Sequence, residues 1–236
     1  MADAPVELLA RDAYVSRGGH KLEAALDAFG ISPAGLVALD VGASTGGFTD
    51  VLLQRGAVRV HAVDVGRGQL AERLRQDPRV VSLERTNARA LTRDLLGEDV
   101  ALSVIDVSFI SLALVLGPVA SCFGADGGPI VALVKPQFEA GRGQTDAGVV
   151  RDAAIHRAVL ERVADAAAAM GLVLRGAIAS PLLGPAGNRE FLFHLAVPTA
   201  LAVAPGSAAA ATAPVERPPT DLDPIWHARF AALAPG

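Results

Sequence analysis

Two lysines are the most distinctive chemical feature of this sequence. Of its 21 basic residues only Lys21 and Lys135 are lysines, and all the others are arginines. A lysine amine can lose its proton at accessible pH, whereas a guanidinium stays charged, so only lysine can accept a proton in a reaction. An accident of an arginine-rich composition explains the two lysines equally well at this point. They are therefore the first candidates for proton-transfer chemistry.

A glycine-rich turn follows the first strongly apolar segment. Residues 39–49 read LDVGASTGGFT, a strand that ends in Asp40 and leads through glycines into a helix. Such a turn lets backbone N–H groups approach a ligand, and Asp64, about 20 residues later, occupies the position that holds ribose hydroxyls in nucleotide sites. A dinucleotide site would need G-x-G-x-x-G, and Asp40 would sit badly beside a pyrophosphate. An acid suits a cationic sulfonium with an α-amino group, so the turn predicts an S-adenosylmethionine site; the alternative is a turn without a ligand.

An acid and a lysine end two later strand-like runs. Asp106 closes the run SVID, and Lys135 closes the run LVK, where Pro136 stiffens the exit. The carboxyl ends of adjacent parallel strands share one crevice, so we expect Asp106 and Lys135 to meet beside the ligand. A purely structural ion pair is the alternative.

Strand-length apolar runs alternate with helical patterns along the chain. The strands are expected at 36–41, 59–65, 80–84, 102–107, 130–134, 172–179 and 190–197. Helices are expected at 18–29, 46–55, 69–76, after Ser111, and at 151–170. This alternation predicts an α/β fold with a doubly wound, mostly parallel seven-stranded sheet, whose last two closely spaced strands give an antiparallel edge.

Composition narrows the protein class. The chain has 236 residues, a formal net charge of −4 and one cysteine, Cys122, so a disulfide framework and a cysteine-based metal site are excluded and no metal is expected. Charged residues interrupt the amino-terminal segment, and the most apolar stretch, 112–123, is too short to span a bilayer. We expect a soluble, cytoplasmic protein that does not act at membranes, with a tail at 1–13, one domain at 14–197, an Ala/Pro-rich linker and tail at 198–236, and a short helix after Asp223-Pro224.

The motifs together resemble one family. The runs YVSRGGHKL, DVGASTGGFT, IDVSFIS, VKPQFE and NREFLFHL occur in order between Tyr14 and Val197. They are similar to the TlyA (hemolysin A) family of FtsJ-like ribosomal RNA 2′-O-methyltransferases. The resemblance implies a class I, Rossmann-like methyltransferase fold that uses S-adenosyl-L-methionine on ribosomal RNA or ribosomal subunits.

The resemblance also implies roles for individual residues. The catalytic tetrad would be Lys21, Asp106, Lys135 and Glu190. The cofactor would be held by Asp40, Gly42, Ser44, Gly46, Gly47, Phe48, Asp64, Asn87 and Asp106. Lys135 would either take the proton of the ribose hydroxyl or hold that hydroxyl as a hydrogen-bond donor.

Other assignments depend on fewer residues. Basic side chains that could meet RNA phosphates are Arg11, Arg17, His20 and Arg142, although solvated arginines are an equal alternative for each. His61 and His194 are predicted to be core residues, and His156 and His227 have no supporting cluster. Family members carry an S4-type RNA-binding domain ahead of YVSRGGHKL, and only 13 residues precede it here, so we expect that domain to be missing.

Three other functions compete with RNA methylation. A small-molecule methyltransferase would respond to metabolites rather than ribosomal subunits. A membrane-active hemolysin would cause liposome leakage, which the lack of a spanning segment disfavours. An RNA-binding protein with an inactive site would transfer no methyl group.

Overall fold

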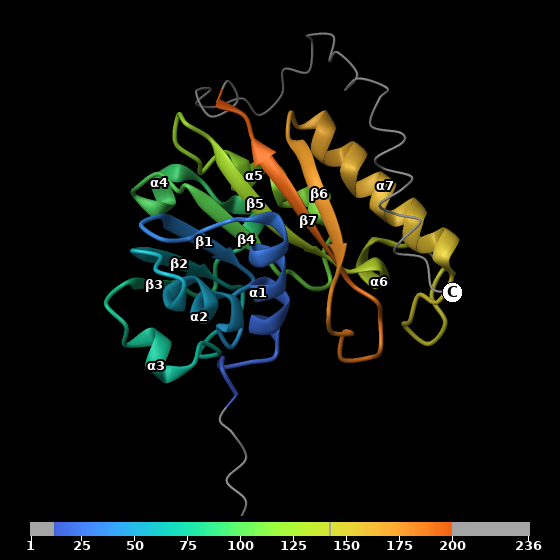
Figure 1. Cartoon of the computed structure of the whole chain (residues 1–236), viewed down its shortest axis with the longest axis horizontal. Helices are drawn as coiled ribbons and strands as arrows, with labels where there is room; N and C mark the ends of the chain where they lie inside the picture. The colour runs from blue at the N-terminus through green and yellow to red at the C-terminus, as the bar shows by residue number, and fades with distance from the viewer. Residues whose placement is uncertain (1–11, 142, 200–236) are drawn as a thin grey trace, which may run out of the picture.

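The computed structural model describes residues 12–141 and 143–199, in which seven strands form one sheet (Figure 1). The strands are β1 (Val37–Val41), β2 (Arg59–Val63), β3 (Val80–Leu83), β4 (Leu102–Ile105), β5 (Gly128–Val134), β6 (Val173–Ala179) and β7 (Phe191–Val197). Their order is β3-β2-β1-β4-β5-β7-β6, parallel except for β7, which runs antiparallel to both neighbours. The predicted mostly parallel sheet with an antiparallel edge is confirmed.

Helices cover both faces of the sheet because alternate residues of each buried strand point to opposite sides. The helices are α1 (Gly18–Phe29), α2 (Gly47–Gln54), α3 (Glu72–Arg75), α4 (Arg93–Leu96), α5 (Leu116–Ala120), α6 (Pro136–Glu139) and α7 (Ala153–Ala169), with 3₁₀ turns η1 (Ala88–Ala90) and η2 (Leu112–Leu114). On one face, Leu22 of α1, Leu52 of α2 and Leu74 of α3 belong to one apolar cluster. On the other face, residues of α5 and α7 pack against Leu39, Ile105 and Phe193.

The strand register brings distant residues to one edge of the sheet. Val41 of β1 pairs with Ile105 of β4, and β4 pairs in parallel with β5. In the antiparallel β5–β7 pair, Val134 lies opposite Phe191, so Lys135, directly after β5, and Glu190, directly before β7, lie at the same edge of the sheet. We call this edge, at the ends of β1, β2, β4 and β5 and the start of β7, the carboxyl edge.

Several predicted elements are shorter than expected. The helix predicted at 69–76 is wrong over its first turn: α3 begins only at Glu72, because Ala71 is in an extended conformation and Leu70 and Leu74 pack beside Gly46. The strands predicted at 59–65 and 102–107 end at Val63 and Ile105, where the chain turns into the carboxyl-edge loops. The segment after Ser111 forms η2 and the short α5. The helix after Asp223-Pro224 and the tail from residue 200 lie outside the described residues.

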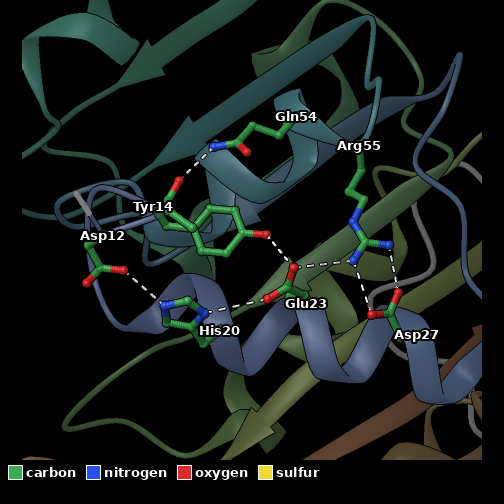
Figure 2. A network of polar contacts seen from close by, with 8 residues as sticks. Asp12, Tyr14, His20, Glu23, Asp27, Gln54 and Arg55 are labelled. Atoms are coloured by element: carbon green, nitrogen blue, oxygen red, sulfur yellow. Dashed lines mark hydrogen bonds and ion pairs between the residues drawn. The ribbon is translucent and has the colours of Figure 1, made fainter. Parts of the chain in front are cut away.

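A polar network ties the start of α1 to α2 (Figure 2). The Tyr14 hydroxyl donates to Glu23 Oε1 at 2.7 Å, and Arg55, the residue that follows α2, pairs with Asp27 at 2.6 Å. A Cβ at Gly19 would lie 2.4 Å from the Tyr14 ring, so only glycine lets the ring pack here. The network therefore fixes α1, which carries Lys21, against the body of the domain.

Among the histidines, the core prediction holds for His61, whose side chain is 2% exposed and contacts Glu98 at 2.9 Å. His194 is only half-buried, with its ring against Phe29. His156 is buried and bonds to the Val150 carbonyl at 3.0 Å. None of the three lies among the predicted site residues.

Candidate active site

The glycine-rich turn connects β1 to α2 and packs against the residue that follows β4. Gly42 has φ +86°, and a Cβ there would lie 2.4 Å from the Asp106 carbonyl oxygen. Ser44 has φ +48°, which is uncommon for a residue other than glycine, and Gly46, with φ +100°, precedes α2. The backbone of the turn at Gly42 therefore packs directly against the backbone of Asp106, whose side chain pairs with Lys135.

Asp64, predicted to hold a ribose, fixes the shape of this turn. Its Oδ2 accepts from the Ser44 N–H at 2.8 Å and its Oδ1 from the Gly66 N–H at 2.7 Å. A small cavity beside it is lined by Ala43, Ser44, Ala62, Asp64, Gly66, Gln69, Leu70, Ser82 and Glu84. Glu84, directly after β3, was not among the predicted site residues. Its position as an acid that follows a strand could have identified it as a candidate. Two acids at the rim suit a ligand that carries hydroxyl and ammonium groups.

Asp40 lies beneath the turn rather than on the surface of the cavity. It is fully buried, and its Oδ2 accepts from the Thr49 hydroxyl at 2.6 Å. Its Oδ1 has no hydrogen-bond partner among the described residues. Burial raises the pKa of this carboxyl to about 7, with Asp106 and Asp64 adding to the increase. A nearby cation would stabilise the ionised form, so the unsatisfied carboxyl is compatible with a cationic cofactor above the turn.

The remaining predicted cofactor residues lie on both sides of the turn. Gly47 and Phe48 form the first turn of α2 under the start of α1, where a Cβ at Gly47 would lie 2.2 Å from Ser16 Oγ. Phe48 is a core residue. Asn87 is exposed and accepts from the Arg89 N–H at 3.0 Å. Their contacts with a cofactor stay predictions.

Lys135 and Asp106 meet at the carboxyl edge. The Lys135 Nζ lies 2.6 Å from Asp106 Oδ1 and donates to Ser108 Oγ at 2.8 Å. The side chains of Lys135 and Asp106 are 12% and 24% exposed. An ammonium has three donors, so these two contacts leave one for a third oxygen. The expected contact is confirmed, and Ser108 is a partner that the sequence analysis missed.

Lys21 and Glu190 form a second, separate pair. Lys21 Nζ donates to Glu190 Oε2, and the two side chains are 10% and 1% exposed. A Cβ at Gly184 would lie 2.6 Å from Glu190 Oε1, so the loop before β7 also encloses this carboxylate. The four predicted tetrad residues thus form two ion pairs.

Two phenylalanines adjoin the Lys135 pair. Phe109 is 89% exposed and has φ +63°, an outlier conformation for a bulky residue. Its ring lies 4.8 Å from that of Phe138, whose centroid is 6.0 Å from Lys135 Nζ. Strained, exposed residues next to a polar cluster are typical of binding sites. The sequence analysis missed both, because no periodic pattern distinguishes either phenylalanine as part of a binding surface.

The residues predicted to contact RNA differ in their surroundings. His20 pairs with Asp12 at 3.0 Å and Glu23 at 3.5 Å, so it belongs to the network at the start of α1, and its pKa is raised chiefly by the hydrogen bond with Asp12 (Figure 2). Arg17 is exposed. Arg11 and Arg142 lie outside the described residues.

Other arginines gather at this edge. Arg67, Arg85 and Arg89 are exposed on the loops after β2 and β3. Within residues 12–141 and 143–199, no carboxylate forms an ion pair with these three or with Arg17. By contrast, Arg55, Arg59 and Arg79, away from this edge, each pair with an acid.

The described residues contain no group of three or more His, Cys, Asp or Glu side chains placed to hold a metal ion. No helix among them is long and apolar enough to cross a membrane.

Comparisons with known proteins agree with this geometry. The FtsJ-like methyltransferase model matches residues 14–197. The chain is 55% identical over 188 residues to the Mycobacterium tuberculosis 16S/23S rRNA (cytidine-2′-O)-methyltransferase TlyA, covering 79% of this chain and 70% of the relative. It is 40% identical over 194 residues to hemolysin A of Brachyspira hyodysenteriae, covering 81% and 80%.

Solved structures show the same fold. A structure from Streptococcus thermophilus, named as a hemolysin, superposes with a TM-score of 0.76 at 51% identity and covers 81% of this chain and 69% of its own. The matched region contains the turn, both ion pairs and every strand. The chain therefore belongs to the FtsJ-like methyltransferase family and resembles its TlyA (hemolysin A) members.

Proposed function

We propose that this protein transfers a methyl group from S-adenosyl-L-methionine to a ribose 2′-hydroxyl of ribosomal RNA. The observation that carries the proposal is the Lys135 ammonium, which Asp106 and Ser108 hold in place. Asp106 in turn lies against Gly42 of the glycine-rich turn. The bound cofactor supplies an electrophilic methyl group on a sulfonium. The named relative from M. tuberculosis supports RNA ribose as the acceptor.

The residues at the carboxyl edge have different roles in an in-line displacement. Gly42, Ser44 and the Asp64 carboxylate shape the turn that would hold the methyl donor, and Asp106, which orients Lys135, would border it. A free N–H of Lys135 would hold the ribose oxygen in line, so that the carbon–oxygen bond could form as the carbon–sulfur bond of the donor breaks. The hydroxyl proton passes to solvent or, where Lys135 is a free amine, to its Nζ. Positioning of this kind supplies most of the acceleration, and general base help adds roughly 10²–10⁴-fold.

The surroundings favour a polynucleotide over a small molecule. The exposed Phe109 ring, packed on the half-buried Phe138, offers a surface on which an unstacked base can stack. The exposed Arg17, Arg67, Arg85 and Arg89, which pair with no acid of the described residues, can contact phosphates on both sides of the turn, although the whole chain has a net charge of −4. We further propose that the enzyme domain spans residues 14–197 and that the protein acts in the cytoplasm, where ribosomal RNA is found.

Tritiated methyl transfer to purified 30S and 50S subunits tests this function. We expect label in ribosomal RNA that digestion recovers as a 2′-O-methylnucleoside, and no comparable transfer to a mixture of small metabolites. Label on a base, or transfer only to metabolites, would contradict the proposal. Leakage of liposomes loaded with dye, without any methyl transfer, would favour the hemolysin reading instead.

A further inference from the structure

Two segments at the carboxyl edge run side by side and contact each other at three levels. Residues 106–111 follow β4, and residues 135–139 follow β5 and include α6. Asp106 pairs with Lys135, Phe109 packs on Phe138, and Ser111 meets Glu139. The first two contacts belong to the reaction and the base surface described above. The third lies at the far end of both segments and has no assigned role.

The Glu139 carboxylate bridges the two segments through both of its oxygens. Oε2 accepts from the Ser111 hydroxyl at 2.7 Å, and Oε1 accepts from the Leu112 N–H at 2.7 Å. We call these two hydrogen bonds the Glu139 bridge. Ser111 Oγ also accepts from the Ala113 N–H at 3.2 Å, and the Leu112 side chain is buried in the core. The bridge therefore anchors the end of the 106–111 loop to both α6 and the core.

Glu139 is itself held from a third element. The Arg162 guanidinium of α7 donates to the Glu139 carbonyl oxygen at 2.8 Å, so the backbone of α6 is fixed to the long helix. Burial raises the pKa of the Glu139 carboxyl, while its hydrogen bonds from Leu112 and Ser111 oppose the increase. The two hydrogen bonds that the carboxyl accepts therefore offset part of the cost of its burial.

We propose that Glu139 is a positioning residue that sets Asp106, Ser108 and Phe109 opposite Lys135 and Phe138 through the Glu139 bridge. This inference rests on the proposed function. The loop between the bridge and Asp106 contains Phe109 in its strained conformation, and such conformations persist only where the surroundings hold both ends of a loop. One end is the Asp106–Lys135 pair and the other is the bridge. A displacement of about 1 Å at reacting groups lowers turnover by roughly 10²-fold, so loss of the bridge acts on the rate although Glu139 touches no reacting atom.

Two variants and a control separate positioning from a general loss of stability. Glu139→Ala removes the bridge, and Glu139→Gln keeps an acceptor for the Leu112 N–H and places an amide against Ser111 Oγ. Thr92→Ala is the matched control, because Thr92 caps α4 by accepting from the Leu95 N–H at 3.2 Å, with no contact at the carboxyl edge.

The readouts are kcat and KM for ribosomal subunits, the Kd for S-adenosylmethionine, and hydrogen exchange of the Leu112 amide. We expect Glu139→Ala to lower kcat about 10- to 100-fold with Kd within about threefold of the wild type, and to speed exchange at Leu112. Glu139→Gln should recover kcat to within about threefold of the wild type, and Thr92→Ala should leave it unchanged.

Each contrary outcome has a distinct meaning. Unchanged exchange at Leu112 in Glu139→Ala would show that the bridge does not exist in solution and would overturn the inference. Faster exchange with an unchanged kcat would also overturn it. An equal loss of kcat in Glu139→Gln and Glu139→Ala would show that the charge of Glu139, rather than the bridge, sets the rate, and would overturn the inference. Failure of the wild type to methylate any subunit would instead contradict the proposed function, while the exchange measurement would still decide whether the bridge forms.

Discussion

The two lysine–carboxylate pairs of this protein have the same chemistry and different surroundings. Lys21 and Glu190 are 10% and 1% exposed and have each other as partners, with α1 and the loop before β7 closing over them. Lys135 and Asp106 are 12% and 24% exposed, and Lys135 also bonds to Ser108 next to an exposed phenylalanine. The difference lies mainly in the carboxylates: Glu190 is sealed, whereas Asp106 can be reached from solvent. We infer that the buried Lys21–Glu190 pair holds α1 in place and that the accessible Lys135–Asp106 pair meets the substrate.

The largest expected effect comes from breaking the buried pair. Glu190→Ala leaves the Lys21 ammonium enclosed without its counter-charge, and removal of one partner of a buried pair costs about 3–5 kcal/mol. Chemical denaturation of the apo protein measures this loss. Glu72→Ala is the control, since the Arg75–Glu72 pair is exposed and such pairs contribute about 0–1 kcal/mol. Equal effects of the two substitutions would show that burial does not make the Lys21–Glu190 pair contribute more to stability than an exposed ion pair.

A smaller effect is expected at the accessible pair's aromatic neighbour. Phe109→Ala removes the exposed ring that packs on Phe138, and base–aromatic stacking contributes about 1–3 kcal/mol per base. We expect the KM for ribosomal subunits to rise roughly 5- to 100-fold, with the Kd for S-adenosylmethionine unchanged. Phe29→Ala, at the far end of α1, is the control for loss of an aromatic side chain. A Phe109→Ala enzyme with wild-type KM would show that the ring does not meet RNA.

The sequence predicted the accessible pair better than the buried one, for a physical reason. Asp106 and Lys135 end two apolar strands, and neighbouring parallel strands must end at a common edge. Glu190 reaches that edge only because β7 reverses direction, and Lys21 reaches it from a helix outside the sheet. Neither placement has a periodic signal, so both came from family resemblance.

Other misses have the same origin in tertiary packing. The conformation of Phe109 depends on contacts at both ends of its loop, and the late start of α3 depends on Leu70 and Leu74 filling the space beside Gly46. The direction of the Asp40 side chain, which its hydrogen bond to Thr49 places beneath the glycine-rich turn, likewise has no sequence signal, and its contact with a cofactor stays a prediction. Strand-end residues are readable from sequence, whereas side-chain directions at those ends are not.

The smallest expected effect concerns the network that holds α1. The folded-state pKa of His20 is raised above its ordinary value by Asp12 and Glu23. Its stabilising contribution is therefore fully present below a pH of about 6.5 and is lost as the pH rises through the raised pKa. His20 is 39% exposed and screened by solvent, so we expect less than about 1 kcal/mol.

Denaturation of the wild type and His20→Gln at several pH values measures this effect. The free energy of unfolding of the wild type should exceed that of the variant below pH 6, and the gap should close at alkaline pH. A gap that is constant with pH would show that the His20 charge does not anchor α1.

The most direct test of the assignment is single-turnover methyl transfer by Lys135→Arg, with saturating ribosomal subunits and cofactor. Arginine keeps the positive charge beside Asp106 but offers a planar fork and cannot act as a base. We predict a cofactor Kd within about threefold of the wild type and a rate of transfer reduced roughly 10²–10⁴-fold. Near-normal transfer by Lys135→Arg would contradict the assignment of the accessible pair as the reaction centre.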